Sequence, residues 1–163
     1  MEYLYIGKYV NTHGLKGEIR LLSNFSHKDK VFVPNMKFYI GKNKKEFIVN
    51  SYRKHKTFDM VTFKDIYNIN QIEDLKGSLV YINKNDLKLD KNTYLAIDLI
   101  GFDVIINDKI IGVINDVIQT NASEILVLDN NIMIPYVKAF INNIEFNNKK
   151  VFINDVKGLL KWR

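Results

Sequence analysis

The side chains best suited to chemistry in this chain lie close to its N-terminus. Gly14 and Gly17 flank Lys16, while Lys8 and Arg20 stand on the segments to either side. Glycine permits positive φ and close backbone approach, and the three cations offer charge to an anionic partner. The spacing predicts a basic docking loop, although a plain β-hairpin connection, whose glycines serve only the backbone, explains the same residues.

A second cluster, Tyr52 to Lys56, combines an aromatic ring with Arg53, Lys54 and His55. Nucleic-acid bases stack on exposed rings beside cations, so the cluster favours nucleic acid as a ligand. A hairpin with a half-buried tyrosine is an equal alternative. His13, at the tip of the first loop, is a further hydrogen-bonding or stacking candidate.

Signals for catalysis, metals and cofactors are missing from the sequence. The chain has no cysteine, which excludes disulfides, thiolate catalysis and Cys-ligated metals. Its three histidines lack metal-ligand spacing, and it has no Gly-x-Ser-x-Gly, phosphate-loop or dinucleotide motif. The closest carboxylate pairs, Glu73 with Asp74 and Asp98 with Asp103, fit helix charge and a cap or turn better than acid/base work. We therefore predict no catalytic residue, no metal and no cofactor.

The charge of the chain is distributed unevenly. Residues 1–88 hold 16 Lys and Arg against 9 Asp and Glu, a net +7, whereas residues 89–163 hold 8 against 9, a net −1. A positive surface confined to one half favours contact with RNA or DNA. The alternative is that part of this charge reflects compositional drift on a solvated face, because the chain is rich in Lys, Asn and Ile. With no signal-peptide pattern and no long apolar run, we expect a cytoplasmic protein that does not bind membranes.

Short alternating or β-branched runs predict a mainly β protein made of two small β-barrels. A polar stretch at 86–93 is the predicted linker between an N-terminal barrel at 1–85 and a C-terminal barrel at 94–163. One helix is predicted at Gln71–Lys76, capped by Asn70 and Glu73 and ended by Gly77. The predicted strands are Tyr3–Val10, Glu18–Leu22, Lys37–Ile40, Phe47–Arg53, Met60–Phe63, Leu79–Ile82, Asp103–Ile106, Ile110–Asp116, Ile125–Leu128, Ile132–Ile134, Ile144–Phe146 and Val151–Ile153.

In four ordered blocks the chain resembles the RimM family of bacterial ribosome maturation factors, over nearly its full length. The blocks are Gly7-Lys8 with His13-Gly14-Leu15-Lys16-Gly17-Glu18-Ile19-Arg20; Asp98-Leu99-Ile100-Gly101; Ile111-Gly112-Val113-Ile114 with Asp116-Val117; and Ala122 to Leu128 with Ile134-Pro135-Tyr136. The resemblance implies an N-terminal barrel similar to those of translation factors and a C-terminal PRC-type barrel.

The resemblance also implies a function. Proteins of this family are non-enzymatic assembly factors that bind the free 30S subunit, assist 16S rRNA processing and head maturation, and contact a head protein, ribosomal protein S nineteen. We expect a monomer with RNA- or ribosome-binding residues Lys8, His13, Lys16, Arg20, Arg53 and Lys54, and with Tyr94 and Asp98 facing the ribosomal protein. The family often has a Tyr-Tyr pair at this last site, of which only Tyr94 is present here.

Two alternatives stay open at this point. The first is an enzyme that processes or modifies rRNA on the precursor of the 30S subunit. The basic half and the loop glycines suggest this alternative. The second is a PRC-type interaction module unrelated to ribosomes, which the basic first half makes less attractive.

Overall fold

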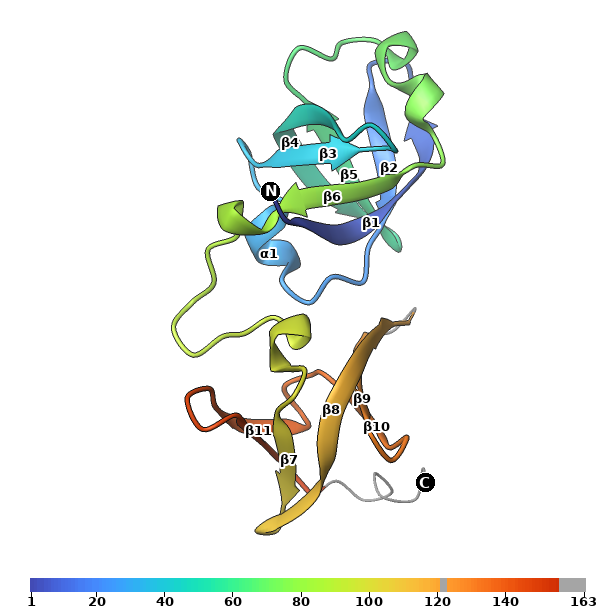
Figure 1. Ribbon diagram of the computed structural model, residues 1–163. Helices are drawn as coiled ribbons and strands as arrows, with labels where there is room; N and C mark the ends of the chain where they lie inside the picture. Colours follow the sequence, from blue (N-terminus) through green and yellow to red (C-terminus); the bar gives the residue numbers. More distant parts are fainter. Residues whose placement is uncertain (121–122, 156–163) are drawn as a thin grey trace. The chain divides into compact units, whose positions relative to one another are not determined.

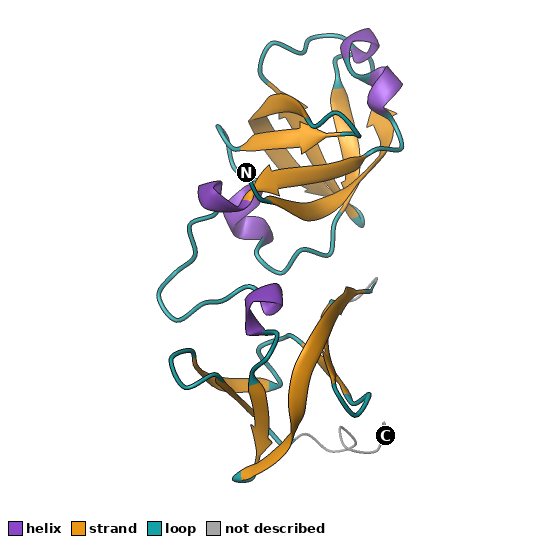
Figure 2. Cartoon of the chain, viewed as in Figure 1, coloured by secondary structure: helices purple, strands orange, loops and turns teal. Residues whose placement is uncertain are grey.

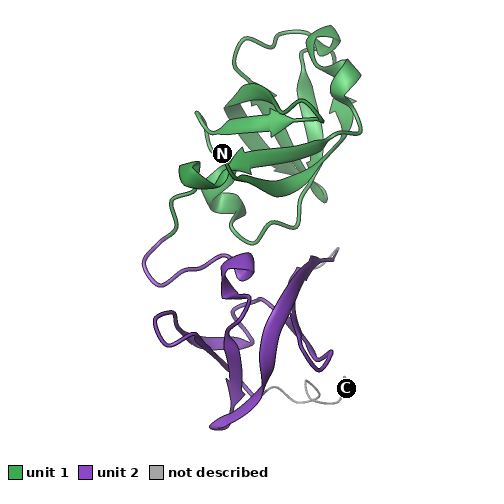
Figure 3. Cartoon of the chain, viewed as in Figure 1, with its two compact units in different colours: residues 1–89 green, residues 90–163 purple. Residues whose placement is uncertain are grey.

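The computed structural model describes residues 1–120 and 123–155 of the chain. It divides into two compact units, Met1–Leu89 and Asp90–Arg163 (Figure 3). Strands dominate both units (Figure 2), which confirms the mainly β prediction. The division falls inside the predicted linker, while the bounds of the three predicted segments stay a prediction. No helix among the described residues is long and apolar enough to span a membrane.

The first unit is a closed barrel of six antiparallel strands (Figure 1). In spatial order these are β1 (Tyr3–His13), β2 (Glu18–Leu22), β5 (Phe58–Phe63), β4 (Lys45–His55), β3 (Lys37–Ile40) and β6 (Leu79–Asn83). Alternate side chains such as Ile19, Leu21, Val61 and Ile82 are buried in its core. Closure pairs every strand on both sides and leaves no free sheet edge.

One end of this barrel is covered by a segment that the sequence analysis did not identify. The short helix α1 (Lys28–Val31) and the residue after it bring Val31 and Phe32 into the core. The Phe32 ring stacks on Tyr52 with centroids 5.2 Å apart. A four-residue helix gives almost no periodic signal in a sequence, so it was missed.

The predicted helix at Gln71–Lys76 is wrong in type and in start. The structure has two 3₁₀ helices there, η1 (Ile69–Gln71) and η2 (Glu73–Leu75). The capping box forms two residues earlier than predicted, because Asn68 caps the Asn70 N–H at 2.8 Å and Gln71 reaches back to the Asn68 N–H at 3.1 Å. A third such helix, η3 (Lys84–Asp86), follows β6.

The second unit begins with η4 (Ala96–Leu99) and continues as one six-stranded sheet around a single apolar core. Its spatial order is β10 (Met133–Pro135), β9 (Glu124–Leu128), β8 (Lys109–Gln119), β7 (Asp103–Ile106), β12 (Lys150–Ile153) and β11 (Ile141–Glu145). The long strand β8 pairs with β7 through its first half and with β9 through its second, and its register shifts between Ile114 and Asp116. Ala122, where one block of the family resemblance begins, lies outside the described residues.

Candidate nucleic-acid interface

The barrel brings the two basic clusters of the sequence together on its outer wall. Strand β5 lies between β2 and β4, so its residue Met60 is opposite Arg20 on one side and Arg53 on the other. Residues directly opposite each other project to the same face of a sheet. Two clusters that are more than thirty residues apart in the chain therefore form one surface, which we call the hairpin cluster: His13, Glu18, Arg20, Arg53, His55 and Phe58.

Arg20 is the centre of the hairpin cluster. Its Nη2 donates to Nδ1 of His13 at 2.8 Å, and its guanidinium lies 5.8 Å from the centroid of Phe58. The rings of His13 and His55 are 5.9 Å apart. Arg20 Nε is buried and has no hydrogen-bond partner among the described residues. This arrangement gathers a cation, two imidazoles and an aromatic ring, which suits phosphate and base contacts.

Arg53 belongs to the same wall, but Glu18 already holds its guanidinium. The Nε and Nη2 atoms of Arg53 donate to the two carboxylate oxygens of Glu18 at 3.0 and 2.8 Å. This hydrogen bonding is the main reason that the pKa of Glu18 lies below its usual value. A ligand that reaches Arg53 therefore encounters a guanidinium that is already paired with Glu18. Desolvation, followed by the charge of Arg53, lowers the pKa of His55, which favours the neutral imidazole.

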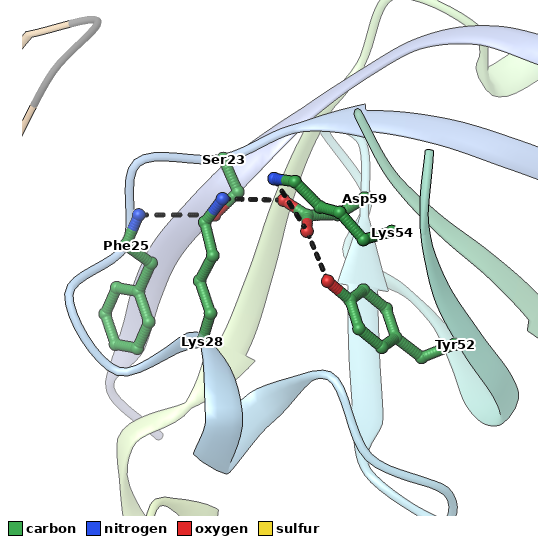
Figure 4. Close-up of polar contacts among 6 residues, drawn as sticks. All are labelled: Ser23, Phe25, Lys28, Tyr52, Lys54 and Asp59. Atoms are coloured by element: carbon green, nitrogen blue, oxygen red, sulfur yellow. Dashed lines mark hydrogen bonds and ion pairs between the residues drawn. The ribbon is translucent and has the colours of Figure 1, made fainter. Parts of the chain in front are cut away.

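Lys54 and Tyr52 point to a different place, the covered end of the barrel (Figure 4). Asp59 is fully buried there. Its carboxylate accepts hydrogen bonds from Nζ of Lys28 at 2.8 Å and from the hydroxyl of Tyr52 at 2.6 Å. Lys54 Nζ lies 3.6 Å from Oδ1 of Asp59, the oxygen that also accepts from Tyr52, whereas Lys28 contacts Oδ2. Burial and the bond to Asp59 raise the pKa of Tyr52, which keeps its hydroxyl a donor. Tyr52 is 36% exposed, but Phe32 stacks on its ring and Asp59 holds its hydroxyl, so this ring is already engaged within the barrel.

The glycine loop is fixed against the segment that precedes η1. Gly14 and Gly17 have φ of 72° and 97°, and a Cβ at Gly17 would lie 2.7 Å from Cγ2 of Ile66. The Leu15 carbonyl accepts from the Ile69 N–H at 3.1 Å. The glycines therefore serve the backbone of the loop, and that backbone holds the exposed Lys16 in place.

Lys16 borders an open hollow of about 600 Å³. Lys64 and the ring of Tyr67, which is 75% exposed, line the same hollow. These two residues are a further cation and a further ring that sequence reasoning missed. They lie about fifty residues from Lys16 in the chain, so no local spacing could have signalled them.

Lys8 does not join the hairpin cluster. It is exposed on β1 between Leu22 of β2 and Leu79 of β6. Five residues of strand separate it from His13, roughly 17 Å at the usual rise. Leu22, opposite Lys8, lies two residues beyond Arg20 on β2, so Lys8 stands at the edge of the cluster, between it and β6.

In the second unit, Tyr94 and Asp98 are both half-buried and both have partners within the chain. The Tyr94 ring stacks on Phe146 with centroids 4.7 Å apart, and the Tyr94 carbonyl accepts from the Tyr136 hydroxyl at 2.5 Å. Asp98 lies in η4, and burial, then the charges of Glu124 and Asp98, raise the pKa of Tyr136. Within the described ranges no group of three or more histidines and carboxylates could hold a metal ion.

Comparison with known proteins covers nearly the whole chain. The RimM N-terminal domain model matches residues 4–87, and the RimM PRC barrel domain model matches residues 96–159. A protein of an Exiguobacterium strain named ribosome maturation factor RimM is 32% identical, over 98% of each chain. A Staphylococcus aureus protein of the same name is 36% identical, over 95% of this chain and 97% of the relative. A Pseudomonas aeruginosa crystal structure described as a 16S ribosomal RNA processing protein RimM is 18% identical, with a TM-score of 0.48 over 94% of this chain and 97% of that one.

Proposed function

The chain belongs to the RimM family, and from that premise we propose that it is a ribosome maturation factor that assists processing of 16S rRNA. We propose further that it does so by binding the free 30S subunit. The relatives that match it over nearly their full length carry the name ribosome maturation factor. Binding of the free 30S subunit is supported by the surfaces described above.

The observation that carries this proposal is the concentration of positive charge on one barrel. Residues 1–89 carry a net charge of +7, from 16 Lys and Arg against 9 Asp and Glu. Within this unit, Lys16 is exposed on a fixed loop and Arg20 stands among aromatic rings. Such a surface binds rRNA phosphates and releases their counterions. Lys16, Arg20 and His13 are the main contacts we propose, and Lys8 binds at the edge of the hairpin cluster.

Arg53 and Lys54 take a smaller part in this proposal than the sequence implied. Glu18 and Asp59 neutralise part of their charge. A phosphate that approaches Arg53 competes with an existing bidentate pair, which reduces the gain from the new contact.

For the second unit we propose contact with a protein rather than with RNA. Its net charge is −1, and a slightly acidic surface complements a basic ribosomal protein such as ribosomal protein S nineteen of the subunit head. Tyr94 and Asp98, at the start of this unit, are the proposed contact residues. Their intramolecular partners hold them in fixed positions, which lowers the entropic cost of binding.

We propose that the protein acts by binding, without catalysis, as a monomer in the cytoplasm. The rival is an enzyme that processes or modifies rRNA of the precursor subunit. Turnover of precursor rRNA by the purified protein alone, abolished by replacing a single carboxylate, would establish the rival and end our proposal.

The decisive experiment is co-sedimentation of the purified protein with free 30S subunits, with 50S and 70S particles as controls, at low and near-physiological salt. We expect selective binding to 30S that persists at the higher salt. Indiscriminate binding that is lost with salt would leave only a basic surface and refute the assembly-factor proposal.

A double variant locates the RNA contacts. Lys16→Ala with Arg20→Ala should weaken 30S binding and flatten its dependence on salt, since each lost phosphate contact lowers the slope by about one. Lys76→Ala with Lys88→Ala removes the same charge from exposed positions elsewhere in the unit and should change both quantities less. An unchanged affinity and slope in the first variant would show that the loop assignment is wrong.

A further inference from the structure

Tyrosines gather on a part of the barrel wall that the hairpin cluster does not reach. Tyr3 and Tyr5 of β1 are each 36% exposed, and Tyr81 of β6 lies beside both. The ring centroids of Tyr5 and Tyr81 are 6.1 Å apart, and those of Tyr3 and Tyr81 are 6.3 Å apart, all in edge-to-face orientation. Tyr39 of β3 is buried against Tyr3 at 5.2 Å. We call Tyr3, Tyr5 and Tyr81 the tyrosine surface.

The strand register explains why the rings meet. Tyr81 lies directly opposite Tyr5 on one neighbouring strand and Tyr39 on the other. The register of β1 shifts between Tyr5 and Gly7. Beyond this shift Lys8 is exposed opposite Leu79, which precedes Tyr81 by two residues on β6 and is itself exposed. Lys8, which the hairpin cluster left unexplained, therefore stands on the same wall as the tyrosines.

Cations surround these rings. Nζ of Lys44 lies 4.3 Å from the centroid of Tyr81 and 5.6 Å from that of Tyr3. Lys44 belongs to the turn between β3 and β4, which also carries the exposed Lys42. Lys45 lies opposite the buried Ile40 and projects to the other face of the sheet, so it is not part of this surface. The carboxylates beside these elements are Glu2, Glu46 and Asp86, and Glu2 lies 3.8 Å from Lys84. The wall is slightly positive, because four lysines (Lys8, Lys42, Lys44 and Lys84) stand against these three carboxylates.

We propose that the tyrosine surface is a binding site for single-stranded RNA. Unpaired bases stack on the exposed parts of Tyr3 and Tyr5, while Lys8 and the lysines of the β3–β4 turn take the phosphates. Stacking on aromatic rings inside a positive groove is how proteins bind single strands with little sequence preference. The inference rests on the proposed role on rRNA for its choice of ligand, and it adds a second contact that is specific for unpaired rRNA.

The charge of the wall decides between RNA and a protein partner. Edge-to-face tyrosines also bind the cationic side chains of other proteins. Here Lys44 already occupies the face of Tyr81, and the neighbouring lysines repel a further cation. A polyanion with flat aromatic bases fits both features, whereas a basic ribosomal protein fits neither.

The test compares a short single-stranded RNA of mixed sequence with the duplex of the same sequence, by fluorescence anisotropy of a labelled strand. The Tyr3→Leu/Tyr5→Leu variant loses the rings but keeps apolar side chains, and Tyr3→Phe/Tyr5→Phe keeps the rings. We expect the leucine variant to bind the single strand about tenfold more weakly and the phenylalanine variant to bind it like the wild type. Neither should change duplex binding, because paired bases do not stack on the protein.

Neutralising the lysines gives a contrasting result. Lys8→Gln with Lys42→Gln should weaken single-strand and duplex binding alike, since both ligands present phosphates. Urea unfolding of each variant verifies that the barrel is intact. Equal affinity of the leucine and phenylalanine variants for the single strand would overturn the inference.

The outcome of this test is separable from that of the proposed function. If the leucine variant loses 30S binding but keeps its affinity for the single strand, the surface contacts a ribosomal protein, which overturns the RNA assignment and leaves the assembly role standing. If single-strand binding depends on the rings but the wild type does not select 30S, the surface assignment holds and the assembly role fails.

Discussion

Two carboxylates in the first unit hold cations in opposite settings. Asp59 is fully buried at the covered end of the barrel, where Lys28, Lys54 and the hydroxyl of Tyr52 converge on it (Figure 4). Glu18 lies on the outer wall and holds Arg53, whose side chain is 48% exposed. Both pairs have short contacts, so distance alone does not distinguish them.

Burial sets the function of each pair. Removing one member of a buried pair leaves polar groups without water or partner, which costs several kcal/mol. An exposed pair contributes little to stability because water and salt screen it. Asp59 therefore acts on folding, by fixing α1 over the barrel, whereas Glu18 acts on binding, by setting how much of the charge of Arg53 a ligand meets.

The largest expected effect comes from Asp59→Ala. We expect it to lower the free energy of unfolding by about 3 kcal/mol, because the Tyr52 hydroxyl loses its acceptor and the two lysines lose a buried counter-charge. The value lies at the lower end for buried pairs because the side chains of Lys28 and Lys54 are 31% and 52% exposed. Urea unfolding followed by circular dichroism measures it.

A matched control for this variant is Asp29→Ala, which removes a carboxylate from an exposed position of the same helix. It should lower stability by less than about 0.5 kcal/mol. If Asp59→Ala were equally mild, the buried carboxylate would have no anchoring role.

Replacing the two lysines separately sharpens the comparison. Lys28→Met should cost about 1 kcal/mol of stability, since its ammonium lies 2.8 Å from Asp59 and is the less exposed of the two. Lys54→Met should cost less than about 0.5 kcal/mol, because its contact is 3.6 Å long and its side chain is half-exposed. The same urea titration measures both variants, and the reverse order would contradict the anchoring geometry.

Glu18→Gln should change binding more than stability. It frees Arg53, so we expect 30S affinity to rise about two- to threefold and its salt slope to steepen by close to one phosphate contact. Stability should fall by less than about 1 kcal/mol. Glu73→Gln, the same charge change at an exposed site of the unit, should leave the slope nearer to that of the wild type. Equal slopes in the two variants would show that Arg53 does not reach the RNA.

The smallest effect is on the pH dependence of stability. The pKa of Glu18 is lowered in the folded protein, mainly by its hydrogen bonds from Arg53, so its stabilising effect is present above its ordinary pKa of 4.5 and is lost as the pH falls through the lowered value. Wild type and Glu18→Gln should therefore converge in stability as the pH falls below 4.5. Urea titrations from neutral pH down to the onset of acid unfolding measure the difference. A gap that widened with acid would contradict the ion pair.

Most strands could be predicted because alternation of apolar and polar residues is a local property. The runs at Glu18–Leu22, Lys37–Ile40 and Asp103–Ile106 agree with β2, β3 and β7 in both bounds. The prediction of a helix at Gln71–Lys76 was wrong because two possible capping boxes overlap there. The contacts of Asn68 and Gln71 show that the earlier box forms. The helix α1 is too short to produce a period, so only its packing against the barrel reveals it.

The sequence by itself determined the family, the mainly β class, the uneven charge of the two halves and the residue types available for binding, since each depends on composition or on short ordered motifs. Only the tertiary structure decided which of those residues stand together. Strand pairing places Arg20 and Arg53 on either side of Met60, turns Lys54 toward a buried Asp59, and places Lys8 on a wall of tyrosines. Strand pairing and register shifts set these neighbours, and both join residues that are distant in the chain.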